Sequence, residues 1–316
     1  MDISVVICTY NRPLRLRGAI ESCLRQSVLP IEIIVVDDGS LEEGFIDEVR
    51  LLVEGRGVKW NYIRKGGAER GLTRSRNIGW RIAIGDVIQF LDDDAELPSL
   101  GLEFAKKVFL SDRDNEIVAI DFPIEECAMD RAGRRVIEFC YSVAGLWKVG
   151  LRFYRCRRLP ESVRELGYCR VNRFLQGGSM LIRKESLEDI GGFDEELGIS
   201  AVGEDKEVSI RLGKIGCIGR INSLFVRHYS EPAGRVDGFR YGCETGFNYL
   251  YINNKIGKLG AGEWLLIGYN VVILICTETL FAFVGNSKFH VSQIKGLLAG
   301  IYRFVLMLCR HRTQST

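Results

Sequence analysis

Three adjacent carboxylates, Asp92, Asp93 and Asp94, follow a strand-like apolar run over residues 86–91. Clustered negative charges repel one another and lose solvation when buried, and a bound cation relieves both effects. Ligation by oxygen alone suits Mg²⁺ or Mn²⁺, which often bridge protein carboxylates and the phosphates of a substrate. Such a triplet is also compatible with a solvated turn before a helix that opens at Pro98, so the surrounding elements decide between the two.

The first 120 residues alternate between two hydrophobic periods. Continuous apolar, β-branched runs at 3–8 and 31–36 predict strands buried on both faces. Apolar spacing of three and four predicts helices at 13–24 and 73–84. Alternation of this kind predicts an α/β fold with a parallel sheet and helices on both faces.

Polar side chains follow the predicted strands. Thr9, Tyr10 and Asn11 come after the first strand, and Asp37 and Asp38 after the second. Ligands bind at the carboxyl ends of the strands in open α/β sheets, so these residues and the acidic triplet should meet at one edge. We interpret this convergence of acids as a ligand site, because stability alone does not require it.

The second half of the chain is less regular. We expect residues 123–172 to form a variable insertion, with regular structure returning at Phe174. Glu204 and Asp205 open a predicted helix, a position that the helix dipole also favours for acids. His228 directly follows a short predicted strand.

The C-terminal segment differs from the rest. Residues 264–285 form a 22-residue apolar stretch, long enough to span a bilayer, whose one charged residue, Glu278, opposes a simple span. A second run, at 294–309, combines an apolar face with basic flanks, as in-plane helices on anionic membranes do. We expect a membrane surface as partner; the alternatives are a buried helical pair and a contact in a homo-oligomer.

The composition limits which classes of binding partner and which cellular compartment fit the chain. The net charge of +2 gives no support for nucleic acid binding. The ten cysteines are scattered without metal spacing, which indicates a reducing compartment. The N-terminal apolar run lacks the features of a signal peptide. We therefore expect a cytoplasmic protein on the inner face of the cell membrane, held there by its C-terminal helices.

Six segments of the chain occur in the order and at the spacing of a known family. They are SVVICTYNR (4–12), IVVDDGS (34–40), GLTRSRNIG (71–79), FLDDDAELP (90–98), residues 177–193 and GED (203–205). Together they resemble the family 2 glycosyltransferases. The resemblance implies a GT-A fold: a mainly parallel, Rossmann-like central sheet, here followed by apolar and amphipathic helices. It implies a domain at 1–250, with a nucleotide-binding half at 1–122 and an acceptor and catalytic-base half at 123–250, then a helical tail at 251–316.

The resemblance also assigns residues to the donor site. Asp38 would hold the nucleotide base, usually uracil. Either Arg74 or Arg76, together with Asn77, would lie near the phosphates. Asp94 would bind Mn²⁺ or Mg²⁺ with His228, and Asp92 or Asp93 would lie nearer the ribose. The remaining residues that would line the nucleotide pocket are Thr9, Tyr10, Asn11 and Arg12.

Asp205 matches the catalytic base of inverting members of the family. An acceptor hydroxyl is a poor nucleophile, so a carboxylate must take its proton as the new bond forms. The departing nucleoside diphosphate builds up negative charge, which a metal stabilises. Glu204 would orient the acceptor or the loop beside this base.

The leading hypothesis is an inverting, metal-dependent hexosyl transfer from a UDP-sugar to a saccharide or a lipid-linked saccharide. The Q-x-x-R-W motif of processive members is missing, which favours transfer of a single sugar. A nucleotidyltransferase would carry a glycine-rich loop after the first strand, and residues 8–13 contain no glycine. A non-catalytic nucleotide-sugar binder or scaffold would have lost its metal or base residues, and both sets are present.

Overall fold

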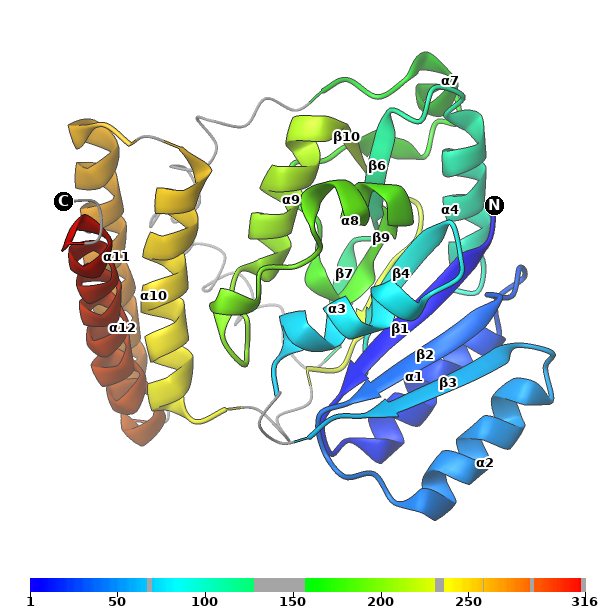
Figure 1. The fold of residues 1–316 in the computed structure, drawn as a ribbon, viewed down its shortest axis with the longest axis horizontal. Coiled ribbons are helices and arrows are strands. Elements are labelled where there is room, and N and C mark those ends of the chain that lie inside the picture. The colour runs from blue at the N-terminus through cyan, green and yellow to red at the C-terminus, as the bar shows by residue number, and fades with distance from the viewer. Residues whose placement is uncertain (67–69, 128–156, 231–235, 258, 285–286, 314–316) are drawn as a thin grey trace. The chain divides into compact units, whose positions relative to one another are not determined.

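The structure is a computed structural model in which the chain forms two compact units (Figure 1). Among the described residues, the sheet unit lies within 1–127, 157–195 and 204–230, and the helical unit lies within 196–203 and 236–313. Much of the predicted insertion, at 128–156, lies outside the described residues. The described residues are 1–66, 70–127, 157–230, 236–257, 259–284 and 287–313.

The sheet unit is built on an eight-stranded sheet, which confirms the α/β prediction. Its strand order is β3-β2-β1-β4-β9-β6-β10-β8. The first four strands are parallel, whereas β9 runs antiparallel to both of its neighbours. The strands are β1 (Ile3–Thr9), β2 (Glu32–Asp37), β3 (Lys59–Arg64), β4 (Val87–Asp92), β6 (Ile117–Asp121), β8 (Cys169–Val171), β9 (Met180–Arg183) and β10 (Cys217–Ile221).

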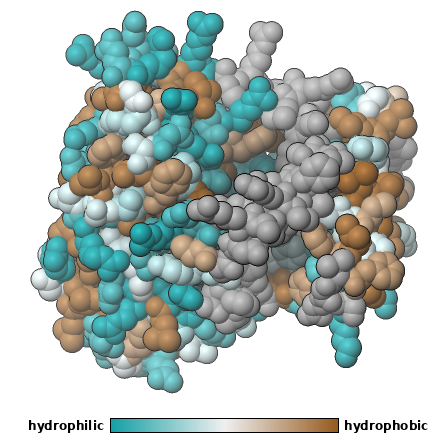
Figure 2. Space-filling view, turned by 180° about the vertical axis from the view of Figure 1, so that it is seen from behind, coloured by the Kyte–Doolittle hydropathy of each residue, from teal (hydrophilic) through white to brown (hydrophobic). Residues whose placement is uncertain are grey.

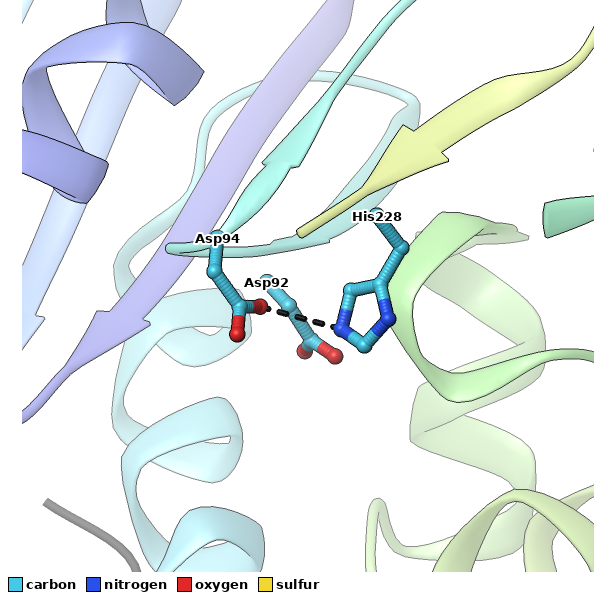
Figure 3. A group of neighbouring side chains, drawn as sticks. All are labelled: Asp92, Asp94 and His228. Atoms are coloured by element: carbon cyan, nitrogen blue, oxygen red, sulfur yellow. Dashed lines mark ion pairs between the residues drawn. The ribbon is translucent and has the colours of Figure 1, made fainter. Parts of the chain in front are cut away.

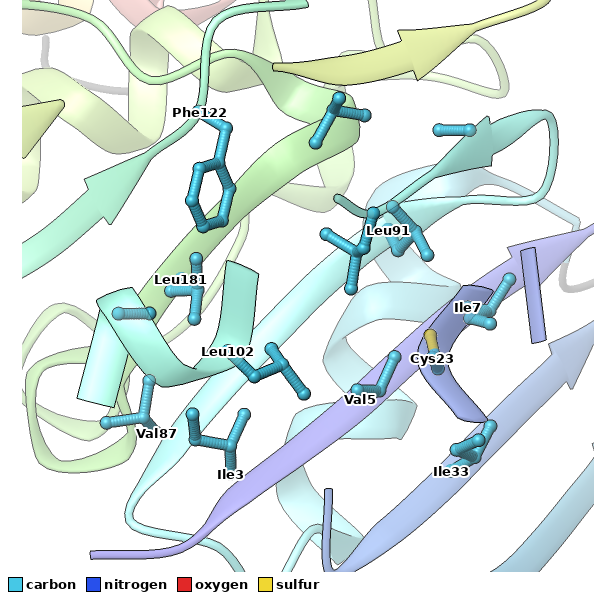
Figure 4. Packing of buried hydrophobic residues seen from close by; sticks show 14 of the residues in the cluster. Ile3, Val5, Ile7, Cys23, Ile33, Val87, Leu91, Leu102, Phe122 and Leu181 are labelled. Atoms are coloured by element: carbon cyan, nitrogen blue, oxygen red, sulfur yellow. The ribbon is translucent and has the colours of Figure 1, made fainter. Parts of the chain in front are cut away.

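Helices pack on both faces of this sheet, as the alternation of the sequence predicts. Val5 and Ile33 lie in one core with side chains of α1 (Pro13–Leu24), α2 (Glu43–Glu54) and α4 (Gly101–Ser111) (Figure 4). On the opposite face, α3 (Leu72–Ile82) packs so closely on β1 that a Cβ at Gly79 would lie 2.4 Å from Val6. The remaining helices of this unit are α7 (Glu161–Arg164), α8 (Lys184–Ile190) and α9 (Glu204–Ile215).

A three-stranded sheet of very short strands was not predicted. It consists of β5 (Ala95–Glu96), β11 (Val226–His228) and β7 (Ile124–Glu126), in that order across the sheet. β11 pairs antiparallel with β5 and parallel with β7. These pairings place His228 beside Ala95 and Glu126, close to the acidic triplet.

The helical unit contains α10 (Gly238–Ile256), α11 (Ala261–Val284) and α12 (Ser287–Thr313). α10 runs across position 250, where we expected the catalytic domain to end. Five glycines bring α10 and α12 into backbone contact. A Cβ at Gly242 would lie 2.0 Å from the Gln293 carbonyl, and one at Gly300 would lie 2.1 Å from the Cys243 carbonyl. The same register continues at Gly238, Gly246 and Gly296, so the two helices run parallel.

α11 and α12 carry the two predicted apolar stretches. Each contains a segment long and apolar enough to cross a membrane, Ala261–Phe283 and Lys288–Arg310. Of an 18-residue apolar window in each segment, 17% and 28% respectively is buried. Large hydrophobic side chains such as Leu265 and Phe283 are exposed on them. Brown, hydrophobic surface lies over these helices at the right of Figure 2.

Candidate active site

A possible cation site lies at the carboxyl end of β4. Asp92 ends β4, Asp94 follows two residues later, and His228 ends β11. Each offers one ligand atom, and these atoms lie within 4.8 Å of one another. The three side chains point into one space (Figure 3), where His228 Nε2 lies 3.1 Å from Asp94 Oδ1.

The second ring nitrogen of His228, Nδ1, also has hydrogen-bond partners. Nδ1 lies 2.9 Å from Glu126 Oε1 and 3.1 Å from the hydroxyl of Ser230. Burial lowers the pKa of His228, but the hydrogen bond and charge of Asp94, with Asp92 and Glu126, raise it to about 9. A carboxylate on the far nitrogen is the usual way to orient a metal-binding imidazole.

This donor set fits a divalent cation. Two carboxylates and one imidazole are acceptable ligands for Mn²⁺, and the carboxylates alone for Mg²⁺. Asp92, Asp94 and His228 are the residues that would hold it. Loss of the His228 proton would leave Nε2 as an electron-pair donor, with Nδ1–H donating to Glu126.

Asp93, the middle acid of the triplet, has a different environment. Thr9 donates a hydrogen bond of 2.7 Å to its Oδ2, and Arg12 contacts its Oδ1 at 2.9 Å. Burial raises the pKa of Asp93 to about 6, while Arg12 and Thr9 act in the opposite direction. Arg12 also reaches Asp94 Oδ2 at 3.4 Å, so it neutralises part of the charge of the triplet.

Arg76 lies behind the candidate cation site and is only 2% exposed. Its guanidinium lies 2.5 Å from Glu204 Oε1 and 3.2 Å from Asp92 Oδ1. A third hydrogen bond, of 3.0 Å, goes to the Gly177 carbonyl. Burial alone would lower the pKa of Arg76, but Glu204 and Asp92 reverse this and raise it. One buried cation therefore connects β4 with the start of α9.

The acids opposite Arg76 are closely packed. Burial raises the pKa of Glu204 to about 7, with Arg76 opposing the shift and Asp205 adding to it. A Cβ at Gly177 would lie 2.6 Å from Glu204 Oε1, and one at Gly178 would lie 2.8 Å from Asp92 Oδ2. Only glycine leaves room for both carboxylates at this turn.

Asp205, the predicted base, is the second residue of α9. Its side chain is half-buried, and its Oδ1 accepts a hydrogen bond of 2.8 Å from the Lys206 backbone N–H. Asp205 is therefore the residue directly after Glu204, whose side chain contacts Arg76.

Asp38 and its neighbours form a second polar group, at the end of β2. Asp38 Oδ1 lies 2.8 Å from Lys65 Nζ and accepts a hydrogen bond of 2.7 Å from the Ser75 hydroxyl. Asp38 Oδ2 accepts from the Gly71 N–H at 2.9 Å. Asp37 is fully buried and bonds within its own turn.

The loop after β1 lies beside this group. Asn11 adopts a left-handed conformation with φ of 55°, and its Oδ1 accepts from the Ser40 N–H at 3.1 Å. The guanidinium of Arg70 lies 3.5 Å from the centre of the Tyr10 ring. This is stacking geometry for a cation on an aromatic face.

The sequence left open whether Arg74 or Arg76 belongs to the site, and the two side chains differ clearly in the structure. Arg76 is buried against the acids, whereas Arg74 is 45% exposed and lies 3.7 Å from Glu195. Asn77 is buried and binds the segment after α8: it donates to the Phe193 carbonyl and to Glu195, and it accepts from the Phe193 N–H.

A family model for glycosyl transferase family 2 matches residues 4–191, more than half of the chain. The chain belongs to this family. It is 34% identical over 260 residues to a glucosyl-dolichyl phosphate glucuronosyltransferase of Haloferax volcanii, covering 79% of this chain and 73% of that protein. It is 26% identical over 250 residues to a chondroitin synthase of Pasteurella multocida, covering 74% of this chain but only 25% of the synthase.

Solved structures confirm the GT-A fold. The chain resembles a mannosyltransferase from Pyrobaculum calidifontis in complex with GDP-Man and Mn²⁺, with a TM-score of 0.57 and 14% identity. This match covers 96% of the chain and 86% of the mannosyltransferase.

Two polar residues of this family 2 site were missed at the sequence level. Lys65, which follows β3, is buried against Asp38, and Glu126 supports His228 from β7. Lys65 directly follows β3, as the other polar residues of this edge follow their strands, so its position was a usable signal. Glu126 lies in an irregular segment and gave none.

Proposed function

We propose that the chain is an inverting, metal-dependent glycosyltransferase that moves a sugar from a nucleoside diphosphate sugar, with UDP as the expected nucleotide, to a saccharide or lipid-linked saccharide. One observation carries this proposal. The buried Arg76 contacts Asp92, a candidate cation ligand, and also Glu204, the neighbour of the candidate base. This contact supports the proposal, because an inverting transfer requires a donor site and a base close to each other.

Asp92, Asp94 and His228 are assigned to the cation and the diphosphate. When bound, the cation would neutralise the charge that develops on the departing diphosphate. Arg12 and Arg76 offset part of the negative charge of the acids, so the carboxylates can lie close together. Glu126 fixes the ring of His228.

Asp205 is assigned as the general base. It would take the proton of the acceptor hydroxyl while that oxygen attacks the anomeric carbon from the face opposite the diphosphate. Attack from this side inverts the anomeric configuration. Glu204, whose pKa burial raises to about 7 against the opposing effect of Arg76, would set the direction of the first turn of α9 rather than exchange protons with the acceptor.

The edge after β1 and β2 is assigned to the nucleoside. A carboxylate has about four lone-pair positions, and Asp38 uses three of them on Lys65, Ser75 and Gly71. Counting the partners that the described residues provide, one position on Oδ2 is left for a base N–H. Thr9, Tyr10, Asn11, Arg74 and Asn77 stay assigned to the nucleotide by resemblance.

Titration calorimetry with UDP, GDP, CDP and dTDP, with and without Mn²⁺, tests the donor site. We expect one diphosphate to bind tightly and only with the metal. Asp205→Asn should abolish transfer and leave that binding unchanged, whereas Asp94→Asn should weaken it. Equal losses of donor binding in both variants would contradict the separate roles, and no binding by folded protein would favour a non-catalytic scaffold.

We further propose that α11 and α12 attach the protein to an anionic membrane surface. Core helices of a soluble protein are mostly buried, and these are not. Replacing Leu265, Val272 and Phe283 with Asn should reduce sedimentation with phosphatidylglycerol vesicles. Asn at the equally exposed Leu14 and Leu51 of the sheet unit serves as a control. Unchanged sedimentation of the tail variant would contradict the proposal.

A further inference from the structure

The loop at 196–203 immediately precedes Glu204 and Asp205, and several of its residues have unusual backbone angles. Gly198, Ala201 and Gly203 adopt left-handed conformations, with φ of 84°, 50° and 87°. Such angles cost free energy for a residue with a side chain, and they persist where surrounding contacts enforce them. Gly203 is bonded to Glu204, so the conformation of the loop sets the direction in which the chain enters α9.

Two buried side chains of α10 hold this loop. Glu244 accepts from the backbone N–H groups of Ile199, at 3.0 Å, and Ser200, at 2.7 Å. A carboxylate that receives two backbone N–H groups makes strong, charge-assisted bonds.

Asn248 completes the contact one turn further along α10. Its amide donates to the carbonyls of Leu197, at 2.8 Å, and Val202, at 3.0 Å. The two side chains thus bind both ends of the loop, and both are buried, so these bonds are protected from competition with water.

Gly198 is the residue of the loop that lies against the Glu244 carboxylate. A Cβ at this position would lie 2.9 Å from Glu244 Oε1 and 2.9 Å from its Cδ. The glycine is therefore required twice, for its positive φ and for the space that the carboxylate occupies.

We propose that Glu244 and Asn248 are positioning residues for the transfer reaction: they fix the 196–203 loop and, through it, the entry of the chain to Asp205. The inference rests on the proposed function of Asp205 as the base. It gives α10 a role in catalysis, supported in turn by the backbone contact between α10 and α12. A base displaced by about 1 Å costs roughly 100-fold in rate.

The test compares Asn248→Asp with Asn253→Asp. Asn253 is also buried on α10, but its amide donates to the Tyr249 carbonyl of the same helix. We expect Asn248→Asp to lower kcat by about 10- to 100-fold, with the affinity for nucleotide and Mn²⁺ unchanged within about twofold. Amide hydrogen exchange of residues 196–203 should become faster in this variant only.

A second pair uses glycine. Gly198→Ala adds the Cβ that meets Glu244, whereas Gly57→Ala carries a similar φ of 74° with nothing within 4 Å of its Cβ. Gly198→Ala should reproduce the kinetic and exchange behaviour of Asn248→Asp, and Gly57→Ala should not.

Exchange and kinetics together decide the outcome. Unchanged loop exchange in Asn248→Asp and Gly198→Ala would overturn the proposal, as would faster exchange with normal kcat. A parallel loss of nucleotide affinity would also overturn it, since that indicates general damage. If the wild-type protein binds nucleotide but transfers no sugar to any acceptor, the proposed function fails, while loop exchange still reports whether α10 holds the loop.

Discussion

β2 and β4 both end in a run of aspartates, but the carboxylates of their last residues, Asp37 and Asp92, differ in the number of protein partners they have. Asp37 accepts hydrogen bonds from the Gly39 and Leu41 backbone N–H groups and from the Tyr62 hydroxyl, and it is fully buried. Within the described part of the chain, Asp92 has one ion pair, with Arg76, and its side chain is 33% exposed. The first carboxylate stabilises a turn, whereas the second is available for a ligand.

The difference lies in the partners that other segments supply. β3 provides Tyr62 to the end of β2, so protein groups already occupy the Asp37 carboxylate there. The end of β4 faces His228 of β11, whose imidazole can exchange a proton for a metal ion. Asp37, which ends β2, is thus a structural carboxylate, whereas Asp92, which ends β4, is a candidate cation ligand.

Exchanging a carboxylate for an amide at each strand end should separate these roles most clearly. Asp94→Asn removes a candidate cation ligand and should reduce transfer at least about 100-fold, with loss of Mn²⁺ binding in calorimetry. Asp37→Asn should keep Mn²⁺ affinity and instead lower the free energy of unfolding by about 1–3 kcal/mol, since an amide group would face backbone donors. Loss of metal binding in Asp37→Asn would contradict the distinction.

Arg76→Met tests the buried cation behind the end of β4. Removing one partner of a buried ion pair should lower the free energy of unfolding by about 3–5 kcal/mol. Arg74→Met on the exposed face of the same helix should stay within about 0.5 kcal/mol. The loss should shrink below the Glu204 pKa of about 7, because the protonated acid needs no counter-charge. Urea denaturation at pH 5.5 and 8 would measure this, and equal losses at both values would contradict it.

Glu126→Gln tests the support of His228. The amide can still accept a hydrogen bond from Nδ1–H, but it lacks the charge that makes the imidazole a stronger donor to a metal. We expect Mn²⁺ affinity to fall by about 10- to 100-fold, with the fold intact by circular dichroism. Glu125→Gln, in the same strand, is the control and should leave the affinity unchanged.

The smallest effect concerns pH. Because the pKa of His228 is raised to about 9, the metal-free ring is protonated at neutral pH, and a metal ion must displace that proton. Mn²⁺ affinity should therefore rise by up to about tenfold per pH unit between 6.5 and 8. His228→Asn should flatten this dependence, and an equally steep dependence in that variant would rule out His228 as its source.

Much of the sheet unit follows from local pattern. The runs at 3–8 and 31–36 predicted β1 and β2 to within one or two residues, because buried parallel strands have a strong apolar signal. The choice between Arg74 and Arg76 was also within reach. Arg76 lies four residues before the buried Trp80 and so shares the inward face of α3, whereas Arg74 does not.

Other features depend on contacts between distant segments. Nothing in the local sequence of β9 indicates that this strand is antiparallel and lies between β4 and β6. β5 and β7 contain two and three residues, too few for a period to be recognised, yet their pairing with β11 brings His228 to Asp94. The imidazole was predicted by resemblance, and its partner Glu126 only becomes visible in three dimensions.

The glycine contacts between α10 and α12 define what can be exchanged between relatives. Neither helix tolerates a Cβ at these positions, so a tail from another family member would meet the wrong surface if the chimera were joined at position 250. A transferable module must begin before Gly238 and include α12. It must also carry the loop at 196–203 that matches its own Glu244 and Asn248. The tail and the loop before the base would therefore have to be exchanged together, as one block.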